Sequence, residues 1–167
     1  MREQGIAGVR ADAVARRLDL TKGSFNHHFS GVADYRRALL DRYERTLTDA
    51  VEQVRDQVTG MPAGRAIAEL PAHWGALDLQ LDTAVRGWAF QDREARAAVE
   101  RVDAARLGLL IDLWAAKLGD RDAARAAALV PHLIAIGASV AQPAPSSADL
   151  GAVFDLLARI APAVPGG

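Results

Sequence analysis

The chain has 167 residues, half of them hydrophobic and a quarter charged, which is the composition of a globular protein rather than a disordered or fibrous one. It contains no cysteine, and this excludes disulfides, a thiolate nucleophile and cysteine-based zinc sites. The net charge of −1 gives the chain as a whole no basic signature of nucleic-acid binding.

Two short helices joined by a tight turn are predicted for residues 14–29. Val14 and Leu18 lie one helical turn apart, and Phe25 and Phe29 repeat that spacing in the second helix, so both pairs point into one small core. Thr21 is a favoured N-cap for the second helix. A short helix held rigidly by a neighbour, with polar side chains outside, is what reading a major groove requires. The candidate DNA-contacting residues are Thr21, Lys22, Ser24, Asn26, His27 and His28.

Charge is distributed unevenly along the chain. Residues 1–45 hold nine basic and six acidic side chains, so the remainder is acidic by four charges. Lys and protonated His suit phosphates, whereas Asn can make two hydrogen bonds to adenine. A basic terminal region attached to a mildly acidic remainder is typical of a DNA-binding protein with a separate domain for another partner.

Helical spacing dominates the rest of the chain, and convincing β alternation is missing. The clearest helix covers residues 32–58, where apolar side chains recur every three or four positions and Gly60 and Pro62 mark the end. Further apolar stripes predict helices over 77–88, 99–113, 129–140 and 150–160. We expect a kink or a break at Pro131. The spacing of Asp78 and Asp82 is that of a solvated helix face.

A set of aromatic and leucine side chains is the candidate ligand site. Each of them could be plain core, but together they would line a space between helices, where bundles form pockets for apolar ligands. Gly87 and Gly108 would leave room for a ligand or a close helix crossing. His73, Arg86 and Asp103 are candidate polar anchors. The ligand-binding set is His73, Trp74, Leu77, Leu81, Trp88, Leu110 and Trp114.

The last two predicted helices are more apolar than one face of a small bundle needs. Their stripes are Leu129, Leu133, Ile136 and Val140, followed by Leu150, Val153, Leu157 and Ile160. Ala135, Gly137 and Ala138 would allow backbones to approach closely. We therefore expect a homodimer with a four-helix interface.

Two segments resemble the TetR-like family of transcriptional repressors. Residues 18–29, LDLTKGSFNHHF, with residues 33–40, ADYRRALL, are similar to its DNA-binding signature. Residues 84–89, AVRGWA, with Asp92 and residues 102–107, VDAARL, resemble a pattern of its regulatory domain. The resemblance implies an all-α dimer. Its helix-turn-helix domain, residues 1–45, would bind operator DNA, and its helical bundle, residues 46–167, would bind a small effector and dimerise.

The chain departs from that family at several positions. Asp19 stands where the family usually has Gly, and Asn26 stands where it usually has Tyr. The family also has a full helix before the motif, of which only Met1–Gly5 could represent the end, so we expect a DNA-binding domain truncated at its start. The alternative is a non-catalytic small-molecule-binding or protein-interaction module of the same fold that has lost DNA binding.

An enzyme is not expected, because the sequence has no Gly-rich phosphate loop, no metal constellation and no nucleophile motif. His27 and His28 are poor ligands for one metal ion, since adjacent residues on a helix point roughly 100° apart. No cofactor is predicted. No apolar run reaches the roughly 18 residues that span a bilayer, and Met1 precedes no apolar signal region, so we expect a cytoplasmic protein.

Overall fold

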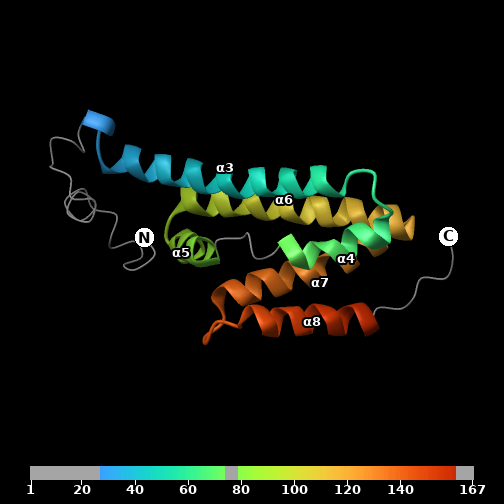
Figure 1. Ribbon diagram of the computed structural model, residues 1–167. Coiled ribbons are helices and arrows are strands. Elements are labelled where there is room, and N and C mark those ends of the chain that lie inside the picture. The colour runs from blue at the N-terminus through green and yellow to red at the C-terminus, as the bar shows by residue number, and fades with distance from the viewer. Residues whose placement is uncertain (1–26, 74–78, 161–167) are drawn as a thin grey trace. The chain divides into compact units, whose positions relative to one another are not determined.

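The computed structural model describes residues 27–73 and 79–160, and every regular element in these ranges is an α-helix (Figure 1). This confirms the expectation of an all-α fold for the described residues. Most of the predicted helix-turn-helix, including Thr21, Lys22, Ser24 and Asn26, lies outside them. The helices are α3 (Val32–Val58), α4 (Ala63–His73), α5 (Leu79–Ala89), α6 (Arg93–Leu118), α7 (Arg121–Val140) and α8 (Ser147–Ile160).

The chain divides by packing into two compact units. Unit 1 comprises Met1–Leu47 and Leu79–Asp103, and unit 2 comprises Thr48–Asp78 and Ala104–Gly167. Helices α3 and α6 therefore each contribute a segment to both units. The functional boundary at residue 45 remains a prediction, because this division groups residues by contact alone.

Helix α3 has the bounds that the apolar stripe predicts. Tyr43, Leu47, Val51 and Val58 are buried at steps of four and seven, which keeps them on one face. The helix ends where Gly60 takes a positive φ of 78°, a conformation that glycine adopts without steric cost. The hydrogen bond from Met61 N to the carbonyl of Val58 closes the turn that follows.

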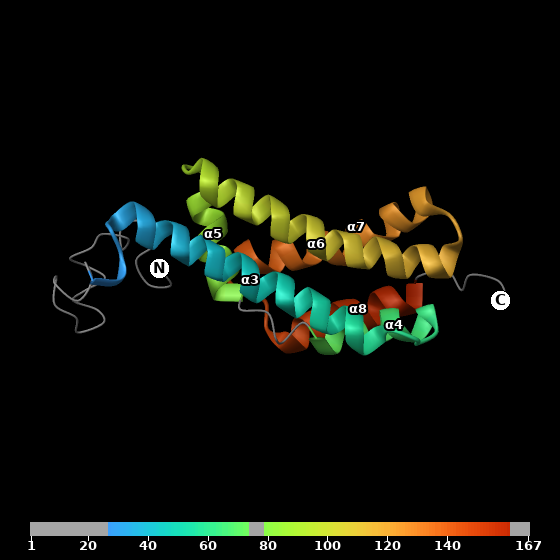
Figure 2. The same ribbon diagram turned by 90° about the horizontal axis from the view of Figure 1, so that it is seen from above.

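In unit 1, α5 runs across α3 and α6 rather than along them (Figures 1 and 2). It buries Val85 and Trp88, which are 2% and 1% exposed. From α6, Val102 is fully buried, along with small residues that let the helices approach. Burying an aromatic side chain of this size is a main source of stability in so small a unit.

Unit 2 contains a helix that the apolar stripes do not predict. Pro62 marks the end of α3, but it also starts α4, because its carbonyl accepts hydrogen bonds from the backbone N–H groups of Arg65 and Ala66. Helix α4 contacts α8. Leu70 of α4 joins Leu110 and Ile111 of α6 in an apolar core cluster, which is completed by Val54, Leu107, Leu113, Trp114 and Ala128.

Helix α7 continues through Pro131, so of the two expected outcomes the break is wrong, while the kink stays a prediction. Asp120 caps its N-terminus by accepting a hydrogen bond from Asp122 N. Residues on both sides of Pro131 are buried, and this packing offsets the roughly 3 kcal/mol that a proline costs inside a helix. Among the described helices, α7 also has the length and mean hydropathy of a membrane span, by composition only. That is weak evidence, because the core helix of a soluble protein can have the same composition.

The two helical glycines singled out in the sequence do not mark close helix crossings. A Cβ built on Gly87 or Gly108 meets nothing within 4 Å. Gly119, which ends α6, differs from both because it has a positive φ of 70°. The turn after α6 therefore requires glycine, whereas the interior of α6 does not.

A pair of glycine substitutions tests this difference. Gly108→Ala should raise the free energy of unfolding by about 0.5–1 kcal/mol, since alanine has the higher helix propensity and its methyl group meets no neighbour. Gly119→Ala should lower it by about 1 kcal/mol or more, because alanine is strained at positive φ. Urea titrations followed by circular dichroism measure both, and equal effects of the two would contradict this account.

Candidate functional site

At the described end of the predicted helix-turn-helix, two of the candidate residues lie in solvent. His27 and His28 are both exposed, and their rings meet edge to face with centroids 5.3 Å apart. Phe29 is half-buried and packs edge to face on Tyr35, with ring centroids 5.0 Å apart. The core predicted from Val14, Leu18 and Phe25 lies outside the described residues, so the inward direction of Phe29 in that core stays a prediction.

Arg36, in the second turn of α3, joins that end of the chain to the turn between α5 and α6. Its guanidinium lies 4.9 Å from the centroid of the Trp88 ring and pairs with the carboxylate of Asp92 at 2.5 Å. Asp92 also caps α6, because its other oxygen accepts the backbone N–H groups of Glu94 and Ala95. Burial raises the pKa of Asp92, but these hydrogen bonds and the Arg36 charge outweigh it, so the pKa lies below its usual value.

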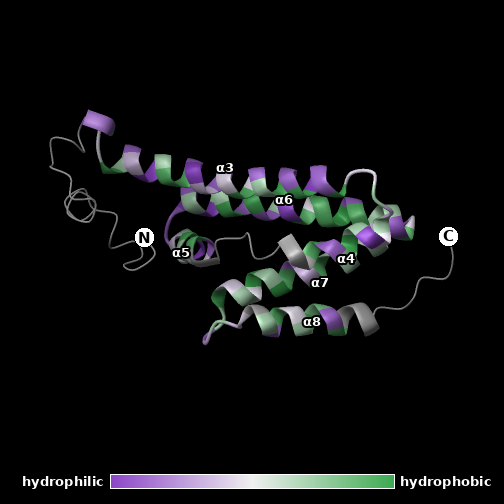
Figure 3. Cartoon of the chain, in the orientation of Figure 1, coloured by the Kyte–Doolittle hydropathy of each residue, from purple (hydrophilic) through white to green (hydrophobic). Residues whose placement is uncertain are grey.

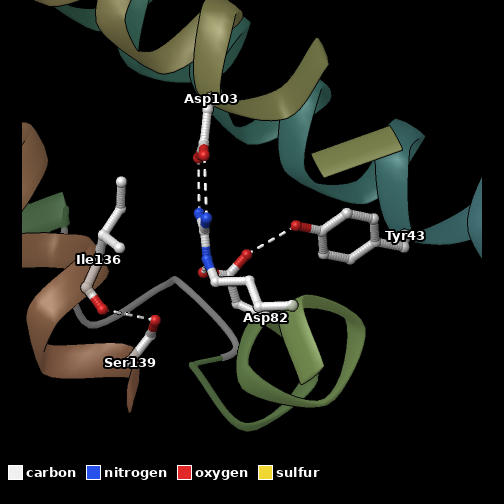
Figure 4. A network of polar contacts seen from close by, with 6 residues as sticks. Tyr43, Asp82, Asp103, Ile136 and Ser139 are labelled. Atoms are coloured by element: carbon white, nitrogen blue, oxygen red, sulfur yellow. Dashed lines mark hydrogen bonds and ion pairs between the residues drawn. The ribbon is translucent and has the colours of Figure 1, made fainter. Parts of the chain in front are cut away.

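A buried polar network holds α3, α5 and α6 together in unit 1 (Figure 4). The Tyr43 hydroxyl donates to one oxygen of Asp82 at 2.7 Å, and Arg86 Nε donates to the other at 2.9 Å. The two terminal nitrogens of Arg86 donate to the two oxygens of Asp103 at 2.9 and 2.5 Å. The guanidinium is therefore shared between two carboxylates, a geometry that favours arginine over lysine.

The expectation that Asp82 lies on a solvated face is wrong, since it is 2% exposed. Burial alone would lower the pKa of Arg86, but the hydrogen bonds and charges of Asp103 and Asp82 more than compensate and raise it. Arg86 and Asp103, predicted as anchors for a ligand, bind each other instead. The spacing of Asp82 and Arg86, four residues apart on one helix, is a sequence signal that could have identified the pair.

The structure assigns the described part of the candidate ligand set to both units. Leu81 and Trp88 belong to unit 1, whereas Leu110 and Trp114 belong to unit 2. In unit 2, Leu110 is buried and Trp114 packs on the apolar cluster, with Lys117 5.7 Å from the centroid of its ring. His73 ends α4, while Trp74 and Leu77 lie outside the described residues.

Helices α7 and α8 expose large apolar side chains, and α7 does so on the side opposite its buried face. That buried face is made of small or polar residues: Ala124, Ala128, His132, Ala135, Ala138 and Ser139. The Ser139 hydroxyl donates to the Ile136 carbonyl at 2.8 Å, so it is satisfied within the helix (Figure 4). We call the exposed set the α7–α8 apolar patch; it comprises Val130, Leu133, Val140, Val153 and Leu156.

Two predicted interface features can be compared with this patch. Leu133, Val140 and Val153 are exposed, as an interface with a second subunit requires. Ala135 and Ala138 are buried against their own chain, so the expectation that they bring two subunits together is wrong. The apolar colouring of α7 and α8 contrasts with the many hydrophilic positions of α3 (Figure 3).

No family model matches the chain, and neither the curated proteins nor the solved structures include a match. Within residues 27–73 and 79–160, no group of three or more His, Asp or Glu side chains is placed to hold a metal ion. The function must therefore be argued from the residues themselves.

Removing one partner from the buried network should cost far more than breaking an exposed pair. Asp82→Ala leaves the largely buried Arg86 charge with half of its partners, so we expect a loss of about 3–5 kcal/mol in the free energy of unfolding. The control, Glu44→Ala, breaks a two-bond pair with Arg101 that is much more exposed than the Asp82–Arg86 pair and should cost less than about 1 kcal/mol. Denaturant titration compares them, and a loss below 1 kcal/mol for Asp82→Ala would contradict the structural role.

Proposed function

We propose that the chain is a ligand-responsive transcriptional regulator, acting as a repressor that binds double-stranded operator DNA as a homodimer. A small apolar effector releases it from the DNA. The chain is not an enzyme in this proposal, and the protein needs no cofactor. The resemblance of residues 18–40 and 84–107 to the TetR-like repressors supports the proposal, and so does the all-helical architecture of the described residues.

The observation that carries the proposal is the way the motif enters α3. His27 and His28 are exposed, while Phe29 turns onto Tyr35, as a reading helix held from behind requires. The nine basic side chains of residues 1–45 add an electrostatic reason for this end to approach phosphates. Within this proposal, Lys22 contacts the DNA backbone and Asn26 contacts a base edge.

Substitutions in the motif should separate these two roles. Lys22→Ala should weaken binding to every duplex and reduce the slope of log K against log salt concentration by about one. Asn26→Ala should relax base preference at one position, worth about 1–3 kcal/mol. Both are measured by fluorescence anisotropy on duplexes that the intact chain selects from a random library.

Arg65→Ala is the control, because it removes an exposed positive charge of α4, outside residues 1–45, and should leave the salt slope unchanged. A chain that selects no duplex even at low salt would overturn the proposal. That result would favour the alternative, a small-molecule-binding or protein-interaction module of the same fold.

The α7–α8 apolar patch supports dimerisation. Leu133 and Leu156 are 58% and 51% exposed, and burying such large apolar side chains against a partner would stabilise the association. The small residues of α7 face its own chain, so the large ones are available to a partner. A twofold interface uses the same patch on both subunits, and apolar side chains without charge are suited to that self-complementarity.

A charge placed on the patch should dissociate the dimer. Leu133→Asp would bury two like charges near each other in a twofold interface, so the dimer Kd should rise at least about 100-fold. Ala116→Asp, at an exposed position of α6 in the same unit, is the control and should leave the Kd unchanged. Sedimentation velocity at micromolar concentrations measures both, and an unmodified chain that sediments as a monomer would refute dimerisation.

The effector is proposed to bind beside the aromatic and leucine residues of unit 2. Trp114 packs against the apolar cluster, and its indole N–H is buried without a hydrogen-bond partner among the described residues. A buried donor of this kind favours a ligand with an oxygen acceptor on an otherwise apolar, flat body. Such a compound would be recognised as one that releases bound duplex and changes tryptophan emission.

A further inference from the structure

We propose that Arg36 and Asp92 form a latch that positions the DNA-binding motif. Through it, the first turns of α3 are fixed to the turn between α5 and α6. The inference rests on the proposed function and deepens it, because it names side chains outside the motif that would set the affinity for DNA. Arg36 acts here as a positioning residue and does not itself contact DNA.

In the part of the chain that the structure describes, the first turns of α3 contribute no fully buried side chain. From Val32 to Leu39 each residue is exposed or only partly buried, and the first buried side chain of the helix is Leu40. The nearby contacts of Asp34 with Ser30 N and of Tyr35 with Phe29 are local in the sequence. Both contacts shape the entry to the helix.

Arg36 attaches the first turns of α3 to a segment more than 50 residues further along the chain. Its guanidinium is held by the Asp92 carboxylate and by the face of Trp88, whose side chain is 1% exposed and cannot move without repacking unit 1. Asp92 is in turn fixed by the two backbone N–H groups that it caps. The Arg36 guanidinium is thus held by two side chains that are themselves fixed in place.

The latch lies close to the motif in the chain. Arg36 follows His28 by eight residues, and Phe29 and Tyr35, which pack on each other, lie between them. Any tilt of the first turns of α3 would therefore be passed to the end of the motif. In a dimer that must engage two half-sites at once, such a tilt lowers affinity without removing any DNA contact.

The Asp92→Asn substitution distinguishes a positioning role of the Arg36–Asp92 pair from the effect of net charge on DNA binding. Asparagine keeps the capping acceptor but loses the charge that pairs with Arg36. The substitution makes the protein more positive by one charge, so long-range electrostatics alone would strengthen DNA binding. Loss of the latch predicts the opposite, a fall in affinity of roughly 5- to 10-fold with an unchanged salt slope, as expected for one partly exposed charged contact.

The matched pair on α3 is Arg36→Ala and Arg37→Ala. Both remove one positive charge from adjacent positions, but Arg37 is exposed and lies outside the latch. Arg36→Ala should lower the affinity by a similar 5- to 10-fold beyond any effect of Arg37→Ala. Arg36→Lys keeps the charge but loses the planar stack, so its affinity for DNA should lie between those of Arg36→Ala and the intact chain. Affinities are measured by fluorescence anisotropy on the duplex that the intact chain selects.

Hydrogen exchange of residues 29–40 gives a readout that needs no DNA. It should be faster in Asp92→Asn and Arg36→Ala than in Arg37→Ala, at equal global stability. Tighter DNA binding by Asp92→Asn, a salt slope lowered by about one in Arg36→Ala, or unchanged exchange would each overturn the latch and leave the proposed function standing. An intact chain that binds no duplex would overturn both.

Discussion

The burial of the Arg86 guanidinium is the constraint on which unit 1 depends. A charge with a side chain only 10% exposed is tolerable only if its donors are matched by carboxylates, and Asp82 and Asp103 supply four oxygens between α5 and α6. Tyr43 of α3 binds the remaining side of Asp82. Because these bonds are directional, they fix the rotation of α5 about its axis, which apolar contacts alone would leave looser.

That rotation decides where Trp88 lies, since it follows Arg86 by two residues on the same helix. The face of the Trp88 ring then packs against the Arg36 guanidinium. Asp92, in the turn between α5 and α6, pairs with the same guanidinium. Asp92 has two functions, because it caps α6 and pairs with α3. A buried ion network is thereby connected, through one aromatic ring, to the first turns of α3.

The sequence predicts the helices whose apolar faces are continuous and misses those that depend on context. Helix α3 has an unbroken stripe from Tyr35 to Val58, so its bounds follow from periodicity. Helix α4 was missed because Pro62 ends one helix and begins the next. Asp82 was assigned to solvent because its partners, Tyr43 and Asp103, are remote in the sequence, and periodicity carries no information on such pairs. The burial of Ala128 and Ala135 likewise outweighs the cost of placing Pro131 inside the helix, and periodicity does not reveal this burial.

Helix α7 shows why apolar spacing cannot by itself say what an apolar face contacts. The stripe of Leu133 and Val140 indicates burial, yet the chain buries the alanines of the opposite face and leaves the large side chains exposed. Alanines permit close packing at little entropic cost, so the helix sits tightly on its own unit through its small side. A large side chain turned outward gains nothing from its own fold. Apolar side chains are common on protein surfaces, so regular spacing alone does not distinguish an exposed apolar face from a buried one.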